Sequence, residues 1–101
     1  MEETKPKYYA IIPAYVRYDN ELNADEKIIY AEITALSILR GYCFATNKYF
    51  SSLYNCHINT ISRRIKALEK HGYIKVMLGR DEKTKNIREK YILQRTLHKK
   101  L

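Results

Sequence analysis

The sequence predicts a mainly helical α+β domain, in which three helices are followed by a small antiparallel β-sheet. Apolar residues recur at helical spacing in three separate segments. Near the end of the chain, two apolar segments alternate as strands do and flank a polar loop. The length of 101 residues, with 46% hydrophobic and 30% charged residues, suits one compact domain. We therefore expect a domain at residues 8–94, a flexible N-terminus at 1–7 and a basic tail at 95–101.

The segment before the first helix is rich in apolar and aromatic residues. Residues 8–16 contain Pro13, which predicts a short extended segment that packs on the surface of the domain. Asp19 and Asn20 are typical turn residues, so a turn is expected before the first helix begins.

The first helix is predicted to run to about Leu39. Asn23 can cap it, and Glu26 stands three residues later, as in a capping box. Gly41 is expected to end it as a C-terminal cap. Residues 42–45 are apolar and β-prone, and predict a small strand.

A second helix is predicted directly after this strand. Thr46 or Asn47 caps it, and it continues to about Tyr54. Phe50 and Leu53 are expected to be its core positions.

A third helix is predicted at about residues 58–71, after a tight turn at residues 55–57. Ile65 and Leu68 lie within about 40° of Ile61 around this helix, so the three residues form its buried face. Its outer face is polar and cationic.

The end of the domain is predicted to be a β-hairpin. Gly72 ends the third helix, and strands follow at residues 73–78 and 87–93 with a charged loop at 79–86 between them. The order of helix, short strand, helix, turn, helix, strand, loop and strand is the winged helix-turn-helix arrangement.

Charge is distributed unevenly along the chain. Residues 1–45 carry five Lys/Arg and seven Asp/Glu, whereas residues 46–101 carry fourteen and four. The first part has a net charge of −2 and the second of +10, which together give +8. This asymmetry indicates a polyanionic partner for the second part. Charge alone does not separate nucleic acid from an anionic membrane or from a solvated basic surface.

The outer face of the third helix favours DNA over a membrane or a solvated surface as the explanation of the basic charge. Its cations and amide lie within about 40° of the pole opposite to the buried face. Asn can pair bidentately with adenine and Arg with guanine, and the N-terminal residues of such a helix reach deepest into the major groove. The candidates for contacts to base edges are His57, Asn59, Thr60 and Arg63, and Ser62, Lys66 and Lys70 complete the DNA-binding face.

Two further groups are candidates for contacts to phosphates. The first turn of the second helix has free amides and the positive end of the helix dipole. The loop between the strands is cationic and can bind an adjacent phosphate or the minor groove. These candidates are Asn47, Lys48 and Tyr49 at the helix start, and Arg80, Lys83, Lys85 and Arg88 in and after the loop.

The sequence argues against an enzyme and against a metal site. His57, His71 and His98 are scattered, and no glycine-rich phosphate loop occurs. Cys43 and Cys56 lack the further ligands of a zinc set, so we interpret both as small buried side chains. No signal peptide or apolar run of roughly 20 residues is recognised. We therefore expect a cytoplasmic protein with reduced thiols and no cofactor.

Three segments carry a resemblance to a known group of proteins. Residues 41–49, 60–65 and 68–74 resemble the winged-helix domains of phage and plasmid replication proteins from Gram-positive bacteria. These are the modules at the N-termini of replisome organisers and initiators, including the DnaD-like group. The resemblance covers roughly residues 10–78 and implies a role in replication initiation on a mobile element.

The turn departs from the pattern of that group, which reads Gly-Val-Ser where this chain reads Asn55-Cys56-His57. Asn55 can replace glycine at a positive φ. His57 replaces the capping serine, which leaves its capping role open and would free it to face DNA.

Two alternatives to a replication initiator remain open. A transcriptional repressor would present the same helix face. A protein-interaction module of another class would use the tyrosine-rich N-terminal segment to dimerise or to bind other replication proteins.

Overall fold

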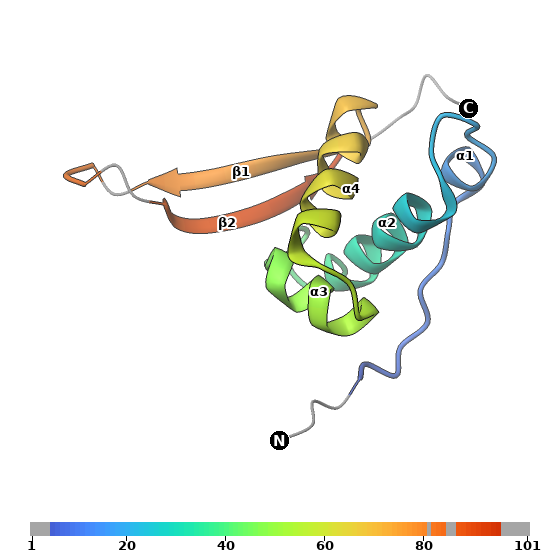
Figure 1. The fold of residues 1–101 in the computed structure, drawn as a ribbon, viewed down its shortest axis with the longest axis horizontal. Coiled ribbons are helices and arrows are strands. Elements are labelled where there is room, and N and C mark those ends of the chain that lie inside the picture. The colour runs from blue at the N-terminus through green and yellow to red at the C-terminus, as the bar shows by residue number, and fades with distance from the viewer. Residues whose placement is uncertain (1–4, 81, 85–86, 96–101) are drawn as a thin grey trace.

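A computed structural model describes residues 5–80, 82–84 and 87–95, except for the side chains of residues 80 and 87–89. The helices form one body, and the two strands form a ribbon that projects from it (Figure 1). The architecture is thus the predicted winged helix-turn-helix. The elements in chain order are α1 (Ala14–Arg17), α2 (Ala24–Leu36), α3 (Asn47–Tyr54), α4 (Ile58–Lys70), β1 (Ile74–Arg80) and β2 (Ile87–Gln94).

The short helix α1 was not predicted. Pro13 precedes it with a φ of −61°, and its carbonyl accepts hydrogen bonds from the amides of Val16 and Arg17 at 3.0 and 2.8 Å. Val16 is fully buried. The expectation of an extended surface segment is therefore wrong at its C-terminal end, because burial of Val16 holds one helical turn against the core.

Helix α2 begins as predicted and ends earlier. Asn23 Oδ1 accepts from the Glu26 amide at 2.8 Å, and the Asn23 amide donates to Glu26 Oε1 at 2.9 Å, so the capping box is confirmed. The helix ends at Leu36 rather than Leu39, because its last turn tightens to bonds between residues three apart. Gly41 then adopts a φ of +79° and donates its amide to Ser37.

The predicted strand at residues 42–45 is reduced to a single bridge between Cys43 and Ile92. The two residues exchange backbone hydrogen bonds of 2.9 and 2.8 Å. Strands β1 and β2 pair antiparallel, from Ile74 opposite Gln94 to Arg80 opposite Ile87. Strand β1 is therefore longer than predicted and extends into the expected loop.

The core lies where α2, α4 and the base of the ribbon meet. The predicted burial of Phe50 in α3 is confirmed, whereas Leu53 is only half-buried and was wrongly assigned to the core. No helix in the described part of the chain is long and apolar enough to span a membrane. The buried apolar residues are Val16, Leu22, Ile29, Tyr30, Ala31, Ile33, Cys43, Phe50, Ile61, Ile65, Leu68, Tyr73, Ile74 and Ile92.

The tyrosines near the N-terminus do not form one surface. Tyr8 donates its hydroxyl to the buried carboxylate of Glu32, which also accepts from Tyr54 at 2.7 Å. Tyr15 is half-buried and stacks on Tyr73. Tyr9, in contrast, is 92% exposed. Tyr8 and Tyr15 therefore fasten this part of the chain to the helical body.

Candidate nucleic-acid interface

The turn between α3 and α4 has the geometry that the sequence predicts. Asn55 ends α3 in the left-handed conformation, with a φ of 53°. Cys43 is buried as expected, whereas Cys56 is only half-buried and packs against the edge of the core. The amide of Cys56 donates to Ser51 O at 3.1 Å. The side chain of Ser51 donates to the carbonyl of Cys56 in return. These bonds hold α3 and α4 in a fixed relation.

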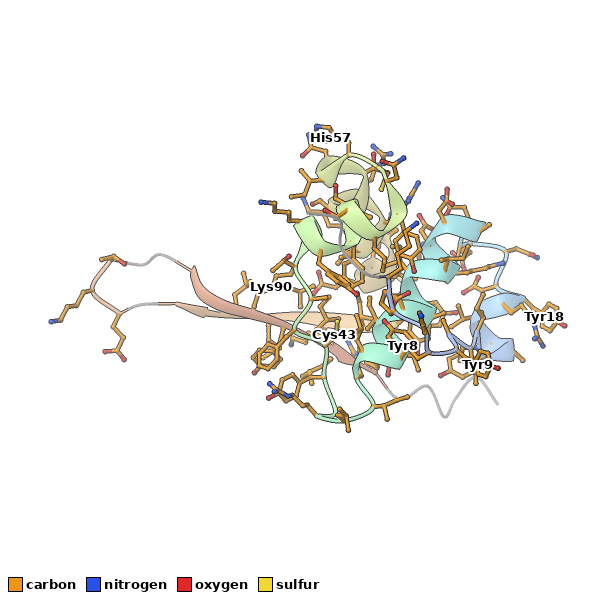
Figure 2. The ribbon with its side chains drawn as sticks, turned by 90° about the horizontal axis from the view of Figure 1, so that it is seen from below. Tyr8, Tyr9, Tyr18, Cys43, His57 and Lys90 are labelled. Atoms are coloured by element: carbon orange, nitrogen blue, oxygen red, sulfur yellow. The ribbon has the colours of Figure 1, made fainter. Side chains whose placement is uncertain are left out.

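His57 caps α4, which answers the question that the sequence left open. Its Nδ1 accepts a hydrogen bond from the Asn59 amide at 3.0 Å. The Nδ1 atom is therefore the acceptor and Nε2 carries the proton. The side chain is exposed at the tip of the helix-turn-helix (Figure 2). His57 thus caps α4 and still presents Nε2 to a partner.

We expect His57→Ala to lower the free energy of unfolding by about 1 kcal/mol, because the Asn59 amide loses its acceptor. His57→Ser should retain the stability of the wild type, since serine is a strong N-cap. Urea denaturation followed by circular dichroism measures both variants. Equal stability of His57→Ala and the wild type would contradict a capping role.

Helix α4 separates a buried face from a cationic one. Ile61, Ile65 and Leu68 are at most 4% exposed, which confirms the predicted buried face. Among the described residues, none of the cations on the opposite side forms an ion pair. The exposed side chains there are Asn59, Arg63, Lys66 and Lys70, with Thr60 and Ser62 half-buried beside them.

Arg64 has a different role from its neighbour Arg63. Its guanidinium lies 3.1 Å from Asp25 Oδ2 at the start of α2, and it also approaches Cys56 Sγ at 3.9 Å. Arg64 therefore joins α4 to α2 and to the turn, whereas Arg63 points into solvent.

The three candidates at the start of α3, Asn47, Lys48 and Tyr49, do not lie on one surface. Thr46 is the cap, since its Oγ1 accepts from the Tyr49 amide at 3.0 Å, and Asn47 is the first helical residue. Lys48 is exposed. Tyr49 lines a cavity together with Leu36 and Phe44, away from the cationic face of α4. The structure thus separates Tyr49 from the other candidates.

The candidates in the wing are described only in part. Lys83 is exposed at the tip of the ribbon, in the turn at residues 82–84. Lys85 and the side chains of Arg80 and Arg88 lie outside the described residues.

Lys90 was not among the residues predicted from the sequence. This β2 residue donates from Nζ to Asn47 Oδ1 at 2.6 Å, at the place where the ribbon meets the helices (Figure 2). Burial lowers the pKa of its ammonium. A signal was present, because Lys90 is two residues before the buried Ile92 and strand alternation places both side chains on the inner face.

Two packed helices joined by a tight turn, an exposed cationic second helix and an adjoining β-ribbon define a winged helix-turn-helix of the DNA-binding type. The chain belongs to the helix-turn-helix domain family, whose model matches residues 20–74. The match covers α2, α3 and α4 and ends at the start of β1. No curated protein and no solved structure matches the chain.

Proposed function

We propose that the domain binds double-stranded DNA at specific sequences, with α4 in the major groove and the wing against the flanking backbone. The observation that carries this proposal is the face of α4 that bears Asn59, Arg63 and Lys66, all exposed and without ion pairs within the described ranges. With 13 residues, α4 is about 20 Å long, and the major groove is about 12 Å wide, which admits a helix.

Selection of bound duplexes from a random library, repeated at two salt concentrations, tests this proposal. Enrichment of one motif at both concentrations supports specific recognition. Binding that falls steeply with salt and enriches no motif would indicate contacts to phosphates alone and would contradict specific recognition.

We further propose that this binding serves replication initiation on a phage, plasmid or other mobile element. The support is the resemblance of residues 41–49, 60–65 and 68–74 to replication proteins. Footprinting on the DNA that encodes the chain tests it. Protection of repeated motifs within a replication origin supports initiation, whereas protection of a single promoter operator would favour a repressor and contradict it.

A further inference from the structure

A groove with a volume of about 470 Å³ lies between α4 and the inner face of the wing. Asn47 of α3, Ser62 and Lys66 of α4 and Lys90 of β2 contribute its polar lining. Its apolar lining comes from α4 and β1. The consecutive helices α3 and α4 and the distant strand β2 therefore bring two ammonium groups, an amide and a hydroxyl to one place.

We propose that this groove binds a single phosphodiester of the DNA backbone and that Lys90 is its principal ligand. The inference rests on the proposed DNA binding and adds to it a positioning site that reads no bases. Lys90 would set the register of the protein on the duplex, while α4 reads the sequence.

The surroundings of Lys90 favour an anion. Within the described residues, no carboxylate pairs with its ammonium, and its hydrogen bond goes to the neutral amide oxygen of Asn47. Burial already disfavours the charged form of Lys90, as its lowered pKa indicates. An anion in the groove would offset that cost. Because Asn47 Oδ1 is turned to Lys90, its amide nitrogen remains available to donate to the same anion.

Glu69 also lines the groove, and its carboxylate disfavours an anion at the end where it lies. Its Oε2 accepts from the Val76 amide at 2.9 Å, and Val76 pairs with Ile92. Lys90 pairs with Leu78, one inward-facing row further from the end of α4. The end near Lys90, Asn47 and Ser62 is therefore the favourable one for an anion.

The position of the groove matches that of a phosphate. A helix in the major groove has a phosphate strand on each side. On the side of the wing, that strand must cross the space between α4 and β1–β2, which is where the groove lies. Contacts to phosphates position the protein on the duplex and carry no information about base identity.

The test is to measure duplex affinity of the whole chain as a function of salt, for the wild type and for Lys90→Met. Loss of one phosphate contact should lower the slope of log affinity against log salt by about 0.9 and weaken binding about eightfold at about 0.1 M salt. The same loss is expected on specific and random duplexes. Lys75→Met is the matched control, because Lys75 is exposed on β1 and faces away from the groove.

Two further measurements separate a binding role from a structural one. Asn47→Asp places a carboxylate on Lys90, so it should weaken DNA binding while the thermal stability of the domain stays the same or rises. In a duplex with single neutral methylphosphonates, one position should weaken wild-type binding and leave Lys90→Met unaffected.

Each result has a clear reading. If the wild type binds duplexes but Lys90→Met and Lys75→Met have the same affinity and salt slope, the proposal of a phosphate site is wrong and the proposed function stands. The same conclusion follows if no methylphosphonate position loses its effect in Lys90→Met. If the wild type binds no duplex, the proposed function itself fails.

Discussion

Above about pH 10, the domain should lose about 2.7 kcal/mol of stability for each further pH unit from Tyr30 and Tyr73 alone. Both side chains are at most 1% exposed. Burial is the main cause that raises the pKa of each hydroxyl well above its usual value of 10.0. Hydrogen bonds add to it, one between the hydroxyls of Tyr30 and Tyr15 and one from the hydroxyl of Tyr73 to Asp19.

The direction of this effect follows from linkage. In the unfolded chain the tyrosines ionise near pH 10, whereas in the folded domain they hold their protons to a higher pH. The folded state therefore binds more protons once the pH exceeds 10. The stability that the two protonated tyrosines contribute is fully present below their pKa in the unfolded chain. It is lost as the pH rises from there through their pKa in the folded domain. Burial raises the pKa of the Cys43 thiol too, which acts in the same direction.

Denaturant titrations at several pH values between about 9 and 12 measure this slope, which approaches its full value above about pH 11, and tyrosinate absorbance reports the ionisation. Tyr73→Phe is the matched variant, because it removes one hydroxyl and keeps the ring that packs on Tyr30 and Tyr15. Its slope should be smaller by about 1.4 kcal/mol per pH unit. Identical slopes for the variant and the wild type would show that Tyr73 ionises equally in both states.

Local signals account for the parts of the fold that the sequence predicts well. The capping box of Asn23 and Glu26 involves residues three apart, and the burial of Ile61, Ile65 and Leu68 follows from helical periodicity within α4. Neither depends on how distant segments pack. The left-handed turn at Asn55 is local in the same sense.

Long-range contacts explain what could not be predicted. A hydrogen bond of 3.2 Å from the Tyr73 hydroxyl to the Tyr15 carbonyl holds helix α1 against the body. The two residues are 58 positions apart in the sequence. Lys90 and Asn47 are 43 positions apart, and their contact needs both the strand register and the placement of α3. Periodicity finds the inward face of β2 but not the groove that this face helps to form.

Arg63→Ala should weaken binding to the selected DNA motif by about 1–3 kcal/mol, or roughly 5- to 150-fold, and should relax the motif at one position. Arg63 is exposed on the cationic face of α4, one turn after Asn59, and no described residue pairs with it. Alanine preserves the helix, so the fold should be unaffected. The affinity of Arg63→Ala for random duplexes should fall only by the smaller amount that the loss of one positive charge causes.

Arg64→Ala is the control that the chain itself offers, because Arg64 adjoins Arg63 and carries the same charge. Its guanidinium is held by Asp25 at 3.1 Å and lies away from the proposed interface. An ion pair of this kind contributes about 0–1 kcal/mol to stability, so Arg64→Ala should change stability slightly and leave the motif intact. Library selection with both variants compares them directly. If Arg63→Ala enriched the wild-type motif with undiminished affinity, or if Arg64→Ala were equally damaging, α4 would not read bases through Arg63.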